Sequence, residues 1–397
     1  MLPMHRQVLL LASAQAIFQT ASVLVTTVGG LAGSTIAPSP LWATAPIATM
    51  VLGTALATVP ASMWMTRVGR RIGFVVGASF GVVGGLIAAF GVATSSLLLL
   101  CLGTLLVGTY QAFAQFYRFA ASEVSTSQFQ PRAIALVLAG GVVAALAGPA
   151  LGRFGADLLR PAYTASFLVL AGVSLLGVLI SLWINVSNTV TNIGQTTIVR
   201  PLRLIVLQPT FLVALFGAAT GYGVMILAMT ATPLAMAASA HGLPATATVI
   251  QLHVLGMFLP SFITGSLIAR FGVLRIMLTG VVLLTGHVLL TLSGTGFSSF
   301  ASALVLLGVG WNFLYIGGTT LLTSTYTAAE KGKAQATNDL TIFLISLASS
   351  LTAGFLENSV GWQTMNLMLL PWLALAAAAI AWKALWSKTW AAAPVGQ

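Results

Sequence analysis

Apolar segments of about twenty residues follow one another along almost the whole chain of 397 residues, and few charged side chains interrupt them. A helix of that length crosses the roughly 30 Å hydrocarbon core of a bilayer, where each segment must satisfy its own backbone hydrogen bonds. Twelve segments meet this condition, at residues 8–31, 41–65, 72–94, 97–121, 133–152, 163–184, 210–236, 246–268, 273–294, 298–322, 337–356 and 364–386. The sequence therefore predicts an all-α membrane protein with twelve transmembrane helices.

The composition agrees with this prediction and excludes an ordinary soluble protein. Hydrophobic residues make up 58% of the chain and charged residues 5%, with a mean hydropathy of +1.02, whereas soluble domains are about 45–50% apolar and about 25% charged. The net charge of +11 arises from sixteen basic and five acidic residues. We interpret this excess as a signal of membrane topology and expect no nucleic-acid partner.

The basic residues indicate the orientation, because Lys and Arg accumulate in cytoplasmic loops. With the N-terminus inside and twelve crossings, only Arg153 and Arg160 fall on the outer side. The other fourteen lie on or near the cytoplasmic side: Arg6, Arg67, Arg70, Arg71, Arg118, Arg132, Arg200, Arg203, Arg270, Arg275, Lys331, Lys333, Lys383 and Lys388. We therefore expect a multi-pass protein of the cell (inner) membrane with both termini in the cytoplasm.

The chain also contains a weak internal repeat. The loop after the second predicted span reads T-R-V-G-R-R, and its Arg67 and Gly69 are matched 203 positions later by Arg270 and Gly272. A second match joins L-L-V-G-T-Y-Q, from residue 105, to L-G-V-G-W-N-F, from residue 307. Repeats with the same membrane orientation are the architecture of one large class of transporters, in which substrate binds near the midplane between the halves.

The repeat divides the chain into two six-helix halves with pseudo-symmetry. We expect an N-terminal six-helix bundle over residues 1–185, a cytoplasmic central loop over 186–208 and a C-terminal six-helix bundle over 209–397.

These residues resemble the major facilitator superfamily. That family's loop pattern G-x-x-x-D-R-x-G-R-R is matched by S-M-W-M-T-R-V-G-R-R from Arg67 to Arg71, with Ser62 in place of the glycine and Thr66 in place of the aspartate. A-G-P-A-L-G, residues 147–152, is similar to part of the superfamily's antiporter motif. Q-F-Y-R-F-A-A, M-T-A-T-P-L-A-M and G-V-G-W-N-F resemble a bacterial branch that includes riboflavin importers. The resemblance implies secondary transport by alternating access.

The resemblance also implies gating residues at the cytoplasmic face. The loops that carry Arg67, Gly69, Arg70 and Arg71, and Arg270 and Gly272, are expected to act as latches. Because the family's aspartate is replaced by Thr66, another acid is needed, and Glu123 and Asp339 are the candidates.

In this architecture helices one, four, seven and ten line the path of the solute, and each carries polar or aromatic residues on one face. Helix one has Gln15, Gln19, Ser22 and Thr26, and helix four has Gln111, Gln115, Arg118 and Ser122 at the same spacing. We predict that the solute is bound by Gln15, Gln19, Tyr110, Gln111, Gln115, Arg118, Tyr222, Gln251, Trp311, Asn312 and Tyr315. The alternative is that these polar groups bond neighbouring helices, and that Arg118 extends toward the membrane surface and Glu123.

No acidic residue lies deep in a predicted span, which favours a neutral or mildly anionic heteroaromatic solute over an organic cation. Import of a vitamin-like compound such as riboflavin is the leading hypothesis, and proton-coupled efflux of drugs or metabolites is the alternative. His253 and His287 could exchange protons near neutral pH, and His253 is the candidate for coupling. For each histidine the alternative is a neutral ring bonded to a neighbouring helix.

A solute sensor or a membrane enzyme is the hypothesis of another class, and the sequence disfavours both. There is no H-E-x-x-H metal motif, no phosphate-binding Gly-Lys-Ser/Thr loop and no cysteine pair. We therefore expect a transporter that is not an enzyme, with no cofactor and no metal. Its expected partners are a small molecule, the lipid bilayer and protons, and we expect it to act as a monomer.

Overall fold

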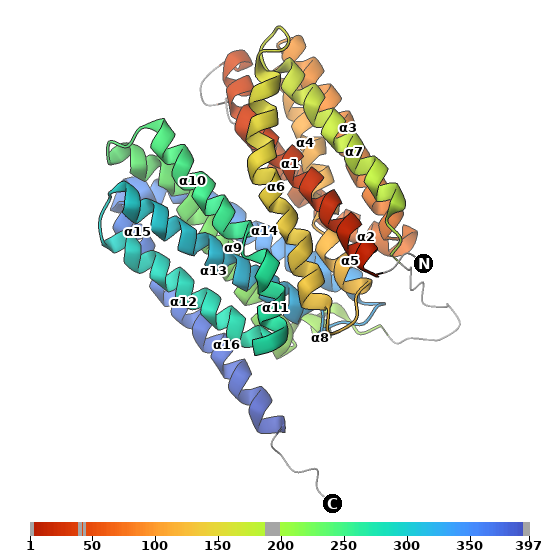
Figure 1. Ribbon diagram of the computed structural model, residues 1–397, viewed down its shortest axis with the longest axis vertical. Helices are drawn as coiled ribbons and strands as arrows, with labels where there is room; N and C mark the ends of the chain where they lie inside the picture. The colour runs from red at the N-terminus through yellow and green to blue at the C-terminus, as the bar shows by residue number, and fades with distance from the viewer. Residues whose placement is uncertain (1–3, 39–41, 43–44, 187–198, 392–397) are drawn as a thin grey trace, which may run out of the picture. The chain divides into compact units, whose positions relative to one another are not determined.

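The computed structural model describes residues 4–38, 42, 45–186 and 199–391, and all regular secondary structure within these residues is helical (Figure 1). The helices are α1 (Met4–Ile36), α2 (Ala45–Val68), α3 (Arg70–Ala93), α4 (Leu97–Ala114), α5 (Tyr117–Glu123), α6 (Gln130–Ala156), α7 (Thr164–Trp183), α8 (Leu202–Val206), α9 (Pro209–Ala238), α10 (Leu243–Phe258), α11 (Ser261–Phe271), α12 (Val273–Leu292), α13 (Phe297–Leu322), α14 (Lys331–Val360), α15 (Trp362–Leu367) and α16 (Leu370–Ala391).

Within the described residues, eleven helical stretches are long and apolar enough to cross a membrane. The last of them, Lys331–Trp386, runs for 56 residues and includes α14, α15 and most of α16. A single crossing needs about 20 residues, so this stretch accommodates both of the last two predicted spans. Two other predicted spans, 97–121 and 246–268, are each divided into two helices, α4 with α5 and α10 with α11.

The chain forms two compact units, and each includes a short piece of sequence from beyond its own main stretch. Unit 1 comprises residues 1–127, 136–197 and 328–340, and unit 2 comprises residues 128–135, 198–327 and 341–397. The first turns of α14 therefore pack in unit 1, while the rest of α14 belongs to unit 2. The predicted central loop, 186–208, falls largely on residues 187–198, which lie outside the described ranges.

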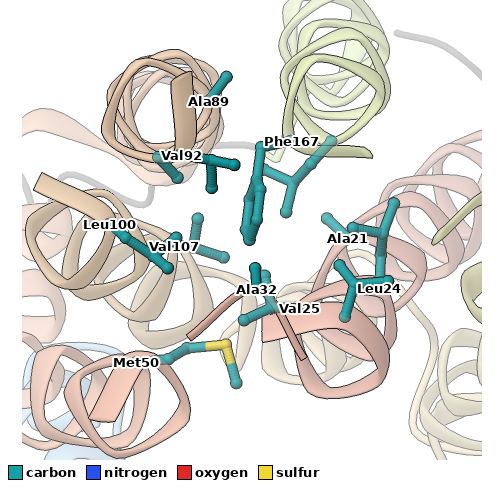
Figure 2. Packing of buried hydrophobic residues seen from close by; sticks show 13 residues of the cluster. Ala21, Leu24, Val25, Ala32, Met50, Ala89, Val92, Leu100, Val107 and Phe167 are labelled. Atoms are coloured by element: carbon teal, nitrogen blue, oxygen red, sulfur yellow. The ribbon is translucent and has the colours of Figure 1, made fainter. Parts of the chain in front are cut away.

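Unit 1 has a core of small and medium apolar side chains from α1, α2, α3, α4 and α7. Figure 2 shows Phe167 of α7 pointing between these helices toward Val25, Val92 and Val107. Lipid is as apolar as a leucine side chain, so helices in a membrane associate through close packing rather than through the hydrophobic effect. The many alanine and valine side chains of this core permit that close approach.

Unit 2 is organised around α13, which packs against α9, α10 and α12. Both α9 and α13 are mostly buried, whereas the other long helical stretches of the unit are buried over a smaller share of their length. α13 carries Trp311, Asn312 and Tyr315, so three of the predicted solute contacts lie on the central helix of the unit.

The internal repeat predicted from the sequence has the same backbone geometry at both copies of the R-x-G turn. Gly69, between α2 and α3, has φ 90° and ψ 159°, and Gly272, between α11 and α12, has φ 88° and ψ 148°. Glycine adopts a positive φ without steric penalty. The two glycines therefore occur where the helices reverse direction, 203 positions apart.

The repeat extends to the helix contacts about two turns earlier. Ser62 on α2 donates a hydrogen bond from Oγ to the carbonyl of Gly332 at the start of α14, at 2.9 Å. Gly265 on α11, again 203 positions later, packs against the start of α6, where a Cβ atom would lie less than 3 Å from backbone atoms of Pro131 and Arg132. Each unit thus holds the first turn of a helix whose remainder belongs to the other unit.

Candidate functional site

Arg118 is a buried charge among the predicted site residues, and it pairs with Asp339. The two side chains are each 2% exposed, and Nη2 of Arg118 donates to Oδ1 of Asp339 at 2.5 Å. Nη1 of Arg118 donates to both the carbonyl and the side-chain Oε1 of Gln115, each at 2.9 Å, at the turn between α4 and α5. Asn338 also donates to Oδ1 of Asp339, at 2.8 Å. A buried charge is tolerated when it is paired and hydrogen-bonded in this way.

A second ion-pair network joins α3, α5 and the start of α14 within unit 1. Arg70 donates through Nη2 to Oε1 of Glu123 at 2.7 Å, and Lys331 donates through Nζ to Oε2 of Glu123 at 2.9 Å. Arg70 Nη2 also donates to Oε1 of Gln335, at 2.6 Å. Glu123 therefore accepts from Arg70, whereas the hydroxyl of Thr66 only bonds its own helix at Met63.

The three arginines of the first loop have different environments. Arg70 is 1% exposed and its guanidinium lies 5.3 Å from the centre of the Phe116 ring. Arg67 and Arg71 are exposed. In unit 2, Arg270 is also exposed and lies over the ring of Phe271.

Three members of these networks were not predicted from the sequence: Lys331, Gln335 and Asn338. They lie with Asp339 at the start of α14, at spacings of 4, 3 and 1, so they share one face of the helix. The sequence K-G-K-A-Q-A-T-N-D could have indicated these residues, because it places polar side chains on one face at the start of a membrane-spanning helix.

The predicted amide stripes of unit 1 are partly satisfied by their neighbours. Gln15 donates from Nε2 to Oε1 of Gln19 at 3.2 Å, and Thr54 donates to Oε1 of Gln111 at 3.2 Å. None of the described residues accepts a hydrogen bond from Nε2 of Gln111, which is half-buried. This amide therefore keeps a free donor.

Tyr110 lies inside unit 1 rather than on the polar stripe. Its side chain is fully buried, its ring packs edge-on against Phe18 with centroids 5.3 Å apart, and it contacts α3 and α7 beside Gly81 and Gly177. In this structure Tyr110 packs helices together.

Unit 2 brings three of the predicted aromatic residues into one cluster. The rings of Trp311 and Tyr315 are stacked, with centroids 5.1 Å apart and planes 22° apart. The ring of Tyr222 lies edge-on to both, at 5.4 Å and 4.8 Å. Nε1 of Trp311 is buried and has no hydrogen-bond partner among the described residues. Buried polar groups without partners are rare in native structures, and functional sites are one explanation for them.

Asn312, the next residue, is engaged at a helix break. Pro260 has no N–H to continue the backbone ladder, and α10 ends just before it. Nδ2 of Asn312 donates to the carbonyl of Met257 at 2.7 Å and to Ser261 Oγ at 2.6 Å, and Oδ1 accepts from Thr264 at 2.7 Å. These bonds use both amide hydrogens of Asn312 to connect α13 with α10 and α11.

The two buried histidines have different hydrogen-bond partners. Both ring nitrogens of His287 lie close to oxygen atoms: Nδ1 is 2.9 Å from the carbonyl of Ala303, and Nε2 is 3.0 Å from Oδ1 of Asn366. Nδ1 of His253 lies 2.9 Å from the carbonyl of Leu304, and its Nε2 has no partner among the described residues. His253 therefore has a free ring nitrogen.

The remaining predicted contact, Gln251 on α10, has an exposed side chain. Within the described residues, no group of three or more His, Cys, Asp or Glu side chains is arranged to hold a metal ion.

Comparison with known proteins identifies the family. No family model matches the chain. The chain is 38% identical over 378 residues to a protein named riboflavin transporter RfnT from Brucella anthropi, covering 94% of both chains. It is 26% identical over 388 residues to YdeG of Bacillus subtilis, an uncharacterized MFS-type transporter, covering 92% of this chain and 89% of the relative. The chain belongs to the major facilitator superfamily.

Solved structures of superfamily transporters have the same fold. The Escherichia coli fucose:proton symporter FucP aligns with a TM-score of 0.76 at 13% identity, covering 94% of this chain and 98% of its own. The human organic anion transporter MFSD10 aligns with a TM-score of 0.76 at 13% identity, covering 96% and 100%. The predicted all-α membrane fold of the superfamily is thus confirmed, and the chain is a multi-pass integral membrane protein and a secondary transporter.

The acid that pairs with the first loop comes from another helix. The family's aspartate position holds Thr66, and the acid that pairs with the loop is Glu123 of α5. The candidate acids predicted from the sequence, Glu123 and Asp339, therefore both pair with arginines of unit 1, each with a different one.

Proposed function

We propose that this transporter imports a planar heteroaromatic solute, riboflavin or a close chemical relative. The observation that carries the proposal is the 38% identity to RfnT, which extends over 94% of both chains. The match extends over most of both units. The solute class was predicted from the polar stripes of unit 1 and the aromatic residues of unit 2.

The chemistry of the predicted site supports a neutral planar solute. Stacked indole and phenol rings such as those of Trp311 and Tyr315 bind flat rings through their faces. Nε1 of Trp311 and Nε2 of Gln111 supply neutral donors for carbonyl oxygens and ring nitrogens. The acids Glu123 and Asp339 are paired with arginines, which disfavours a cationic solute.

We further propose that the predicted residues have different roles. Gln15, Gln19, Gln111, Trp311 and Tyr315 contact the solute. Tyr110 and Asn312 stabilise the helices that position them. The two ion-pair networks at the start of α14 hold one conformation of the alternating-access cycle, and they break when the transporter opens on that side.

The proposal includes the topology inferred from the basic residues. Both termini lie in the cytoplasm, the protein resides in the inner membrane as a monomer, and the six-helix halves 1–185 and 209–397 are joined by the loop 186–208. The basic ends of α2, α11 and α16 then face the cytoplasm.

The direct test is uptake of riboflavin by proteoliposomes that contain the purified protein. We expect saturable uptake that unlabelled riboflavin competes away and that organic cations do not. Trp311→Ala should reduce uptake at least tenfold, and Trp311→Phe should retain part of it because a ring face remains. Trp183→Phe, at an exposed tryptophan at the end of α7, is the matched control. Gradient-driven efflux of cations, without riboflavin uptake, would instead support the antiporter alternative.

Proton coupling through His253 has its own test. Its unpartnered Nε2 supports this choice over His287, whose ring nitrogens both have partners. His253→Gln should abolish the dependence of uptake on an imposed proton gradient while leaving exchange of riboflavin at equal pH intact. An unchanged gradient dependence would exclude His253 as the coupling site.

A further inference from the structure

An apolar groove of about 490 Å³ lies on unit 2, bounded by the first turns of α9, the part of α14 that begins at Thr341, and the end of α16. Leu212, Phe216 and Ala219 form one side, and Ile345, Ala379 and Trp382 form the other sides. Thr341 contributes the only polar side chain of the lining. The volume is within the range of about 300–1,000 Å³ that is typical of ligand pockets.

The length of the groove matches the thickness of one leaflet of the membrane. Its lining on α9 runs from Pro209 to Ala219, and ten residues of helix rise about 15 Å. Half of the roughly 30 Å hydrocarbon core is also about 15 Å. Leu212 and Trp382 are 46% and 49% exposed, so the groove is open along its length.

Aromatic and basic side chains mark the membrane surface at one end of the groove. Trp382 and Trp386 on α16 are stacked with centroids 5.6 Å apart, and Nζ of Lys383 lies 5.8 Å from the Trp386 ring. Arg203 is exposed on α8, directly before α9, in a helix with exposed leucines. Tryptophan gathers at the interface of a membrane, and lysine and arginine extend their charges to the headgroups.

The charge of unit 2 favours an anionic headgroup. The sequence ranges of unit 2 hold seven of the sixteen basic residues but one of the five acidic residues, Glu357. Glu357 lies sixteen residues beyond Thr341 on α14, which is about 24 Å along the helix axis. Asp339, two residues before Thr341, is ion-paired with Arg118.

We propose that this groove binds a single anionic phospholipid, with one acyl chain along α9, α14 and α16 and its phosphate held by Lys383 and Arg203. Because α14 begins in unit 1 and continues along the groove, the bound lipid stabilises the same helix whose first turns carry the ion-pair networks.

Native mass spectrometry of the full-length transporter, titrated with phosphatidylglycerol and with phosphatidylethanolamine of the same acyl chains, tests the proposal. Wild-type protein should retain one phosphatidylglycerol in preference to phosphatidylethanolamine. Removing one basic side chain should weaken retention roughly fivefold, and the Lys383→Gln, Arg203→Gln double variant roughly 25-fold, since each charge contributes similarly to attraction by anionic lipid. Arg153→Gln, an exposed charge on α6 in unit 1, is the control for loss of charge.

A second pair of variants tests the groove itself. Ala379→Phe fills it and should abolish preferential retention, whereas Ala378→Phe, at the adjacent exposed position outside the lining, should leave retention unchanged. Monodisperse size-exclusion profiles establish that both variants are folded. Equal retention of the two lipids by wild type, or retention unaffected by Ala379→Phe, would overturn the proposal. So would a dimer that forms in detergent and is disrupted by Ala379→Phe, since the occupant would then be a second copy of the chain.

Discussion

Individual charged residues in this protein are distinguished by burial rather than by type. Arg70 and Arg71 are neighbours in the sequence, yet Arg70 is buried against Glu123 and Gln335, while Arg71 is exposed. An exposed charge contributes little to stability because water screens it. When one member of a buried ion pair is removed, the other charge is left unpaired in a medium of low dielectric constant.

This difference makes Arg70 and Arg71 a matched pair for mutagenesis. Arg70→Gln should destabilise the protein by about 1.5–3 kcal/mol, the usual value for a lost hydrogen bond to a charged group, because Glu123 keeps only Lys331. Arg71→Gln should leave the melting temperature unchanged. Thermal unfolding in detergent micelles measures both, and equal effects of the two substitutions would contradict the assignment of Arg70 to the network.

The Arg118–Asp339 pair tests the cost of an unpaired buried charge at a site where both partners are buried. Asp339→Asn leaves the buried guanidinium without a counter-charge and should destabilise the protein by about 3–5 kcal/mol. The double variant Arg118→Met, Asp339→Leu should recover most of that loss, since apolar pairs often replace buried ion pairs without penalty. Thermal unfolding of Arg118→Met, of Asp339→Leu and of the double variant gives the coupling energy, and additive losses would show that the two residues do not act as a pair.

At the scale of helices, the structure depends on backbones that approach closely and on helices that break at defined places. Gly265 lets α11 contact the backbone at the start of α6. Pro260 interrupts the helix between Met257 and Ser261, where Asn312 donates to the carbonyl of Met257 and to Ser261 Oγ. In lipid no water can replace such bonds. These positions therefore constrain the path of the helices that carry the candidate site.

Glycine substitutions separate close helix contacts from ordinary helical positions. Gly265→Ala should lower thermal stability, because the added methyl group overlaps backbone that cannot move aside. Gly172→Ala, in α7 with no atom within 4 Å of the new methyl group, should be neutral or should stabilise the protein by up to about 1 kcal/mol through helix propensity. Equal melting temperatures for the two variants would mean that α11 and α6 are not in close contact.

At the scale of the whole molecule, the proposed transport cycle requires two halves with the same membrane orientation. The R-x-G turns at Gly69 and Gly272 have nearly the same backbone angles. Parallel repeats place equivalent turns on one side of the membrane. The proposed topology therefore has both basic loops at the same surface.

Cysteine labelling of intact cells tests this topology. In a Cys101→Ala background, Arg71→Cys and Arg275→Cys should react with a membrane-impermeant maleimide only after the membrane is opened, whereas Arg153→Cys should react from outside. Labelling of positions 71 and 275 from opposite surfaces would exclude parallel halves, and with them the proposed mechanism of transport.

The fold was predictable from the sequence because membrane-spanning helices are specified locally. Each must be long, apolar and internally hydrogen-bonded, so the apolar segments predicted the class of protein, and the repeated R-x-G turns agreed with the superfamily to which it belongs. The stacking of Trp311 with Tyr315 also followed a local pattern, since residues four apart on a helix are neighbours.

Only the tertiary structure decided which polar residues pair with one another. Arg118 bonds to Asp339 across 221 positions of sequence, and Arg70 bonds to Gln335 across 265. The side chain of Tyr110 packs between helices of unit 1, although its neighbour Gln111 lies on the polar stripe. The physical reason is that a helix in lipid satisfies its own backbone but not its side chains. The sequence by itself determined where the helices lie, and the partners of their buried charges and amides depend on which helices pack together.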